Sequence, residues 1–211
     1  MSGYFFQTRS ELTSAVNEWV TNQSNATLIY GEINTWDVSN ITDFSYLFEN
    51  QTNFNSDISN WDVSSGTDFT RMFNSASSFN QNINNWDVGS GTDFGTMFFG
   101  AYAFNSDISN WDVSSGTNFS GMFFKSYAFN SDIRNWDVSS GENFAAMFYE
   151  AFQFDQDLST WNVSSGTDFN QMFFDAILMR SSGWSTTPIR ANFLGQTLSG
   201  TNGADNLYGG S

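Results

Sequence analysis

Residues 58–69 read ISNWDVSSGTDF, and residues 108–119 repeat this stretch with a single change. Tryptophan recurs at a constant step of 25 residues, and valine follows it two positions later in every copy. The tryptophans are Trp36, Trp61, Trp86, Trp111, Trp136 and Trp161. Two phenylalanine columns, which begin at Phe44 and Phe48, keep the same step. Units that repeat without insertion predict a solenoid, because one such unit cannot bury its apolar residues alone and must stack on its neighbours.

The apolar spacing inside a unit predicts its local structure. Ile58, Trp61 and Val63 follow the strand pattern of a leucine-rich repeat, so we expect a short β-strand with Trp61 and Val63 facing inward. The stretch SSGT that follows is a turn by composition. Tryptophan in such a strand has two readings. A buried core column is the simpler one, and an exposed platform on which sugars stack is the alternative.

The second half of the unit predicts a short helix or 3₁₀ turn over 67–73, capped by Thr67 or Asp68. Phe69, Met72 and Phe73 are spaced three to four residues apart and would lie on its inner face. We therefore expect a leucine-rich-repeat-like solenoid of six units, each with one short strand and one short helix or 3₁₀ turn.

The ends of the chain differ from the repeats, as terminal caps of a solenoid do. Residues 1–32 are expected to form an N-terminal capping helix and lead-in, with an amphipathic helix over 8–21 for which Ser10 is a good N-cap. The six repeats then occupy 33–182. Residues 183–199 would form a C-terminal cap, and 200–211 a separate tail.

Composition excludes several functional classes. The chain has 22 acidic and 6 basic residues, a net charge of −16, which disfavours nucleic acid and anionic membranes as partners. It lacks cysteine and histidine, so disulfides and the usual general base are absent. No run of apolar residues is long enough for a membrane span, and the opening residues do not resemble a signal peptide. We expect no enzyme, because repeats supply copies whereas catalysis needs one asymmetric constellation.

The unit FNSDISNWDVSSGTDFTRMF, residues 54–73, resembles the repeat of BspA-like leucine-rich-repeat surface proteins of bacteria, which reads F-N-x-D-I-S-x-W-D-V-S-x-V-T-x-M-x-x-M-F. The resemblance implies an extracellular, surface-displayed adhesion module, monomeric within a longer chain. Its partner would be a glycan or protein on a host or neighbouring cell. This chain departs from the pattern in the second valine column, where five units have glycine and only the first keeps an apolar residue, Ile41.

The tail GTNGADNLYGG, residues 200–210, resembles the calcium-binding nonapeptide of RTX proteins. That resemblance implies that Asp205 is a Ca²⁺ ligand and that the domain comes from an RTX-type adhesin. A flexible glycine-rich tail is the alternative reading.

Outward-facing polar columns are the candidate binding residues. Stacked carboxylates about 4.8 Å apart would repel by about 0.9 kcal/mol in water, so hydrogen bonds, solvent or bound cations must offset the charge. The candidate ligand-binding column comprises Asn60, Asp62, Asn85, Asp87, Asn110, Asp112, Asn135 and Asp137.

Two further columns begin at Asp57 and Asn55, and their side chains either cap turns or bind Ca²⁺. A threonine row that begins at Thr42 suggests an ice-binding face. The sequence thus leaves three functions open: adhesion, a structural spacer in an adhesin stalk, and ice binding.

Overall fold

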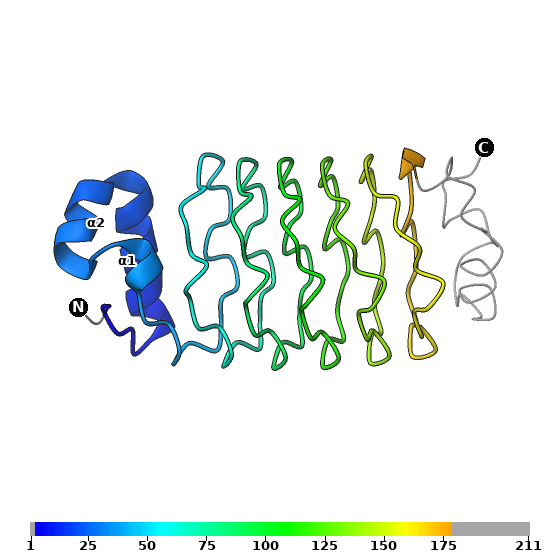
Figure 1. Ribbon diagram of the computed structural model, residues 1–211, viewed down its shortest axis with the longest axis horizontal. Coiled ribbons are helices and arrows are strands. Elements are labelled where there is room, and N and C mark those ends of the chain that lie inside the picture. The colour runs from blue at the N-terminus through cyan, green and yellow to red at the C-terminus, as the bar shows by residue number, and fades with distance from the viewer. Residues whose placement is uncertain (1–2, 179–211) are drawn as a thin grey trace.

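A computed structural model of the chain describes residues 3–178. Two helices, α1 (Arg9–Thr21) and α2 (Gln23–Tyr30), and a 3₁₀ turn, η1 (Ile33–Thr35), precede a row of coils. Figure 1 shows the helices at one end and the coils stacked side by side along the long axis. Each coil corresponds to one 25-residue unit, and no extended strand occurs among the described residues; parallel pairing is confined to isolated bridges.

The N-cap of helix α1 lies two residues earlier than the sequence indicates. Thr8, not Ser10, is the N-cap: its hydroxyl accepts a hydrogen bond from the Glu11 backbone N–H. The Glu11 carboxylate in turn accepts from the Thr8 backbone N–H at 3.1 Å, which completes a capping box. The glutamate three residues after Thr8 is the sequence signal that selects this start. Leu12, Val16 and Trp19 are buried beside the first coil.

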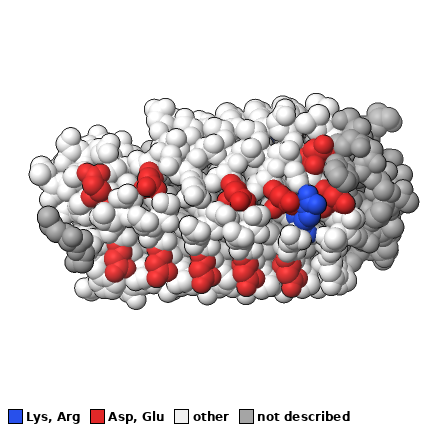
Figure 2. Space-filling model, viewed as in Figure 1, with Lys and Arg blue, Asp and Glu red and all other residues white. Residues whose placement is uncertain are grey.

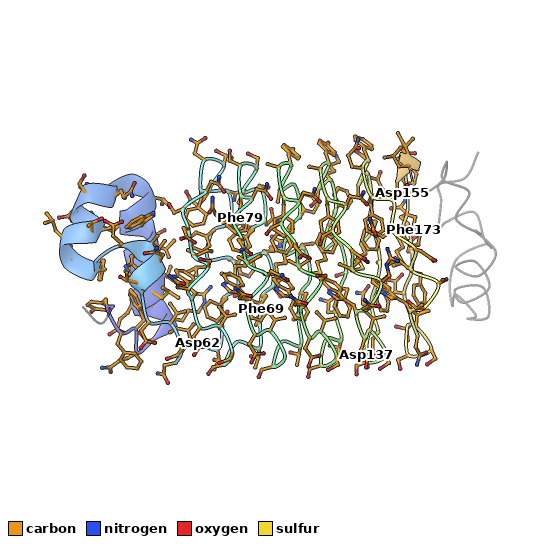
Figure 3. The ribbon with its side chains drawn as sticks, in the orientation of Figure 1. Asp62, Phe69, Phe79, Asp137, Asp155 and Phe173 are labelled. Atoms are coloured by element: carbon orange, nitrogen blue, oxygen red, sulfur yellow. The ribbon has the colours of Figure 1, made fainter. Side chains whose placement is uncertain are left out.

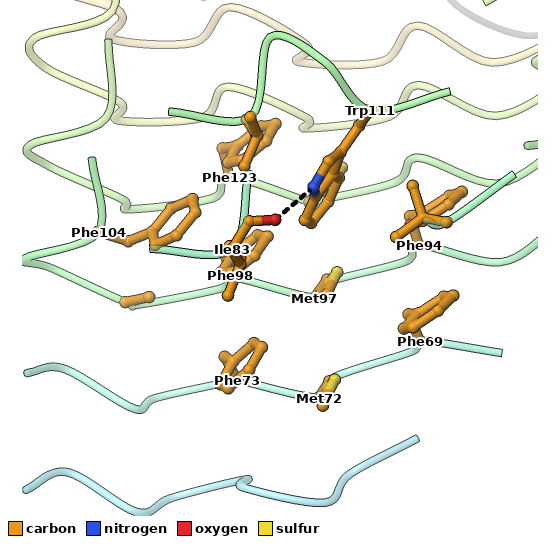
Figure 4. Close-up of a cluster of buried hydrophobic side chains, with 14 of the residues drawn as sticks. Phe69, Met72, Phe73, Ile83, Phe94, Met97, Phe98, Phe104, Trp111 and Phe123 are labelled. Atoms are coloured by element: carbon orange, nitrogen blue, oxygen red, sulfur yellow. Dashed lines mark hydrogen bonds between the residues drawn. The ribbon is translucent and has the colours of Figure 1, made fainter. Parts of the chain in front are cut away.

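The core consists of aromatic columns that stack from coil to coil. Phe69 and Phe94 lie 5.5 Å apart between ring centroids, with planes 3° apart, and Trp86 and Trp111 lie 6.5 Å apart with the same angle. Figure 4 shows the Phe69 and Phe94 rings beside Met72 and Met97. The six repeat tryptophans are only 2–4% exposed, so the alternative of an exposed sugar-stacking platform is wrong.

A ladder of indole hydrogen bonds links the coils, and sequence reasoning did not predict it. The Trp111 Nε1–H donates to the Ile83 carbonyl at 2.9 Å, across 28 residues (Figure 4). The same bond joins Trp61, Trp86, Trp136 and Trp161 to the residue 28 positions earlier, at 2.8–3.2 Å. A buried indole needs an acceptor, and a buried carbonyl needs a donor. Each of these five tryptophans therefore satisfies one backbone group 28 residues earlier in the chain.

The strand predicted around Trp61 and Val63 is in the wrong place. These side chains do point inward, but the Trp61 N–H bonds locally to the Ile58 carbonyl. The parallel bridges instead link Asp43, Asp68, Asp93, Asn118, Asn143 and Asp168 in sequence. The apolar alternation correctly predicts side-chain direction, whereas the local turns take up backbone groups that would otherwise pair between coils.

The helix or 3₁₀ turn predicted over 67–73 is also wrong. Alternate N–H groups donate to the next coil, as Phe69 does to the Asp93 carbonyl at 2.9 Å. The intervening ones close overlapping turns, as Met72 does to the Phe69 carbonyl at 3.1 Å. Arg71 has a φ of 56°, and the same position is left-handed in the other units, which interrupts any helix.

In five of the six units the glycine column leaves room for a phenylalanine ring. A Cβ on Gly116 would lie 2.4 Å from Cζ of Phe119 and 3.0 Å from the Val113 carbonyl oxygen. The glycines of this column do not have left-handed φ values, so backbone conformation does not require glycine there. The family pattern pairs valine with methionine three positions later. Five units of this chain pair glycine with phenylalanine, and the first unit pairs Ile41 with Phe44. The larger ring fills the space that the missing side chain leaves.

We propose that this stack is a repeat solenoid whose coils lack the strand and helix of a leucine-rich repeat. The end of the sixth unit after residue 178, the expected cap over 183–199 and the tail over 200–211 lie outside the described residues.

Candidate binding surfaces

The aspartates of the candidate column form a regular row along one edge of the stack. Figure 2 shows acidic side chains in line along the lower edge, and Figure 3 places Asp62 and Asp137 there. The row consists of Asp37, Asp62, Asp87, Asp112 and Asp137, all of them exposed. Their neighbours Asn60, Asn85, Asn110 and Asn135 are also exposed. The structure therefore brings the eight candidate residues together on one surface.

Each aspartate of the row accepts a hydrogen bond from its own turn. The Oδ1 of Asp62 accepts from the Ser64 backbone N–H at 3.1 Å and from the Ser64 hydroxyl at 2.6 Å. Asp87, Asp112 and Asp137 each accept from the N–H two residues later at 3.0 Å, and Asn162 does the same at 3.2 Å. These bonds stabilise the charged carboxylate, which offsets part of the repulsion along the row.

The turn hydrogen bonds lower the pKa of two aspartates of the row, Asp112 and Asp137. Hydrogen bonds from the Ser114 hydroxyl and backbone N–H hold the pKa of Asp112 below its ordinary value, against an opposing contribution from the charge of Asp137. The Ser139 hydroxyl and N–H lower the pKa of Asp137 in the same way. A carboxylate whose pKa is lower in the folded than in the unfolded chain stabilises the fold above its unfolded pKa. This contribution is lost as the pH falls through the folded pKa.

The double variant Asp112→Asn/Asp137→Asn tests this linkage. Asparagine keeps the Oδ1 acceptor, as Asn162 does, and removes two neighbouring charges. At pH 7 we expect an unchanged or slightly lowered melting temperature, because the variant lacks the stabilisation that the two charged carboxylates contribute. Between about pH 5 and pH 2 the variant should lose less stability than the wild type, because two fewer groups take up protons on unfolding. Melting followed by circular dichroism at several pH values measures both effects; equal losses on acidification would contradict the assignment.

The second polar column has the same local role. Asp57 accepts from the Ser59 N–H at 2.9 Å, and this backbone bond is the main cause of its lowered pKa. The pKa of Asp132 is lowered mainly by the Arg134 side chain, whose Nε lies 2.8 Å from Oδ1. The column therefore caps turns, and no group of three or more potential metal-ligating side chains occurs between residues 3 and 178.

The third column forms an amide ladder. The Oδ1 of Asn55 accepts from the Asn80 N–H at 2.9 Å, Asn80 accepts from Asn105, Asn105 from Asn130, and Asn130 from Asp155. Each side chain thus holds the backbone of the next coil.

The threonine row is exposed, but its hydroxyls are engaged. The Thr92 hydroxyl donates to the Thr67 carbonyl of the preceding coil at 3.2 Å, and Thr117 repeats this contact with Thr92. Glu142 interrupts the row. Asp205, the predicted Ca²⁺ ligand, lies outside the described residues.

Two rows of aromatic side chains lie on the outside of the later coils, and sequence reasoning missed them. We call them the outer aromatic rows: Phe99, Phe124, Tyr149 and Phe174 in one, and Tyr102, Tyr127 and Phe152 in the other. Their ring centroids are 4.3–4.8 Å apart, with planes 3–10° apart. All seven are partly or largely exposed, and Tyr102 is 49% exposed.

The outer aromatic rows are absent from the first two units. The equivalent positions there are polar: Glu49 and Asn74 for the first row, and Thr52 and Ser77 for the second. The signal was present in the sequence as positions at which otherwise identical units differ. These positions do not contribute to the repeat pattern, which is defined by the columns that stay constant.

Comparison with known proteins gives one result. A family model described as "Mycoplasma protein of unknown function, DUF285" matches residues 22–114 and again residues 92–186. No curated protein and no solved structure matches the chain. Among the described residues, no helix has the length and apolarity needed to cross a bilayer.

Proposed function

Because the chain belongs to the DUF285 family of repeat proteins, we propose that it is a non-enzymatic binding module of a bacterial surface protein. Its partner is a glycan or a protein on another cell or surface, and its role is adhesion. The module works as a monomeric part of a longer extracellular chain. The likeness of its repeats to BspA-like proteins and of its tail to RTX repeats supports this placement.

The outer aromatic rows are the observation that carries the proposal. A spacer needs the same surface on every unit, and here the internal columns are nearly invariant while the outer surface changes from polar to aromatic after the second unit. Contiguous exposed apolar side chains on a soluble protein mark interaction sites. Aromatic residues are also enriched where binding energy is concentrated.

Two alternatives keep specific support. The uniform Asp row, engaged in its own turns, favours a structural spacer. The exposed threonine row favours ice binding, although its hydroxyls already bond to the preceding coil. Ca²⁺ binding by Asp205 or by the aspartate columns stays a further proposal.

Arrays of surface glycans and peptides, probed with and without Ca²⁺, test the proposed function. We expect binding to at least one class of probe. The triple variant Tyr102→Ser/Tyr127→Ser/Phe152→Ser gives these coils the residue found at Ser77, and it should weaken binding about tenfold or more. Thr67→Ser, on the exposed threonine row, is the control and should bind as the wild type does.

Other outcomes redirect the assignment. Loss of binding in Asp62→Asn/Asp87→Asn, with the triple serine variant unaffected, would move the binding surface to the candidate column. No binding to any probe favours the spacer. Shaped ice crystals in the presence of the protein would favour ice binding.

A further inference from the structure

A groove lies between the helical cap and the first coil. Trp19, Val20 and Gln23 line it from the helices, and the segment 50–56 lines it from the coil. Its volume is about 420 Å³, within the range of small-molecule sites. The outer aromatic rows are on later coils, so the groove is separate from the surface proposed above.

The groove carries no charge in a strongly acidic chain. Its ten lining residues include no Asp, Glu, Lys or Arg. Five of them are carboxamides: Gln23, Asn50, Gln51, Asn53 and Asn55. Two are hydroxyl residues, Thr52 and Ser56. A site of this kind has no countercharge for a phosphate or carboxylate, whereas each carboxamide both donates and accepts hydrogen bonds.

The first coil differs from the others at this segment. The position of Gln51 is alanine in four of the other five units and Ser126 in the remaining one, and the position of Asn53 is Ala103 and Ala128 in the third and fourth units. A contact made only to seat the cap would be apolar, as it is at Leu12 and Val16. The side chains of Gln23, Gln51 and Asn53 make no hydrogen bond with any residue that the structure describes. Their donors and acceptors face the groove or the solvent.

The walls of the groove are held in place. The Trp19 Nε1–H donates to the Ser56 hydroxyl at 3.0 Å, and both Trp19 and Phe54 are almost fully buried. Turn hydrogen bonds from Gln51 to the Phe48 carbonyl and from Phe54 to the Gln51 carbonyl fix the loop. Because these elements are already ordered, binding of a ligand has a lower free-energy cost for ordering the site.

We propose that this groove binds a short, neutral oligosaccharide. Sugar hydroxyls donate and accept hydrogen bonds at close spacing, which complements a set of carboxamides and hydroxyls. The net charge of −16 adds a repulsion against acidic sugars. The groove recognises hydroxyl patterns through side-chain amides, since the buried indole of Trp19 presents no open face.

The test uses the full chain and four neutral disaccharides: cellobiose, lactose, mannobiose and chitobiose. NMR titration of ¹⁵N-labelled protein is expected to shift the side-chain amide signals of Gln51 and Asn53 with at least one of them. The variant Gln51→Ala/Asn53→Ala introduces residues that other coils already have, so its fold should be kept. It should weaken binding about tenfold, the loss expected from two hydrogen bonds. Gln153→Ala, at the position of Asn53 in the fifth coil, is the matched control and should bind as the wild type does.

Several results would overturn the proposal: no shift with any disaccharide, equal binding by the groove variant, tighter binding of sialyllactose than of lactose, or binding only of uncharged peptides. The triple serine variant of the outer aromatic rows should bind the disaccharide normally. A loss of array binding in the triple serine variant and a loss of disaccharide binding in the groove variant can therefore be told apart.

Discussion

Replacing Gly116 with valine is expected to lower the free energy of unfolding by about 3 kcal/mol. A single added Cβ would already lie 2.4 Å from Cζ of Phe119, and valine adds two further methyl groups. The ring cannot move freely, because it stacks on Phe94 and Phe144 at centroid distances of 5.6 and 5.4 Å. Urea unfolding followed by tryptophan fluorescence measures the loss.

A second substitution makes this prediction specific. Phe119→Met restores the valine–methionine pair of the family repeat, so the double variant should be more stable than the sum of the single changes predicts. Residues in contact show coupling energies of about 0.5–3 kcal/mol, and we expect a favourable value in this range. Ser115→Ala, at the exposed neighbour, is the control and should change stability by less than about 0.5 kcal/mol. Additive losses would show that glycine is needed for another reason.

The same glycine column shows what the sequence could and could not predict. The constant step and the inward direction of Trp61, Val63 and Phe69 follow from repetition and apolar spacing, and all three side chains are buried. The exchange of glycine for valine was visible as a departure from the family pattern. The cause of this exchange could not be predicted, because it depends on the position of the phenylalanine ring three residues later.

Backbone conformation was harder to predict than side-chain direction. Period-two alternation looks the same in a paired strand and in an unpaired extended segment. The spacing of Phe69, Met72 and Phe73 likewise suits both a helix and a series of turns. Non-glycine residues with left-handed φ, such as Arg71 and Lys125, decide between them, and such residues leave no clear sequence signal.

The candidate column illustrates the same limit for the binding surface. The exposure of its side chains followed from the apolar alternation. The hydrogen bonds that Asp62 accepts in its own turn are one of the three predicted ways to offset the repulsion between stacked carboxylates. The outer aromatic rows and the cap groove lie where units differ from one another. In a repeat protein the invariant positions describe stacking, so positions that vary from unit to unit are where a binding surface should be sought.

Replacing Trp111 is the second change with a large expected effect. Trp111→Ala should lower the free energy of unfolding by about 3–5 kcal/mol, because it empties a core position between Trp86 and Trp136. It also removes the donor that satisfies the buried Ile83 carbonyl.

Trp111→Phe separates the hydrogen bond from the packing. Phenylalanine refills much of the space but cannot donate a hydrogen bond. The buried Ile83 carbonyl is then left without a donor, which should lower the free energy of unfolding by about 1–3 kcal/mol. Met122→Leu changes a fully buried residue with little change in volume, and it should cost less than about 1.5 kcal/mol. Urea unfolding of the three variants compares them directly. If Trp111→Phe is no more destabilising than Met122→Leu, the indole ladder does not stabilise the stack, and the tryptophan column contributes by packing alone.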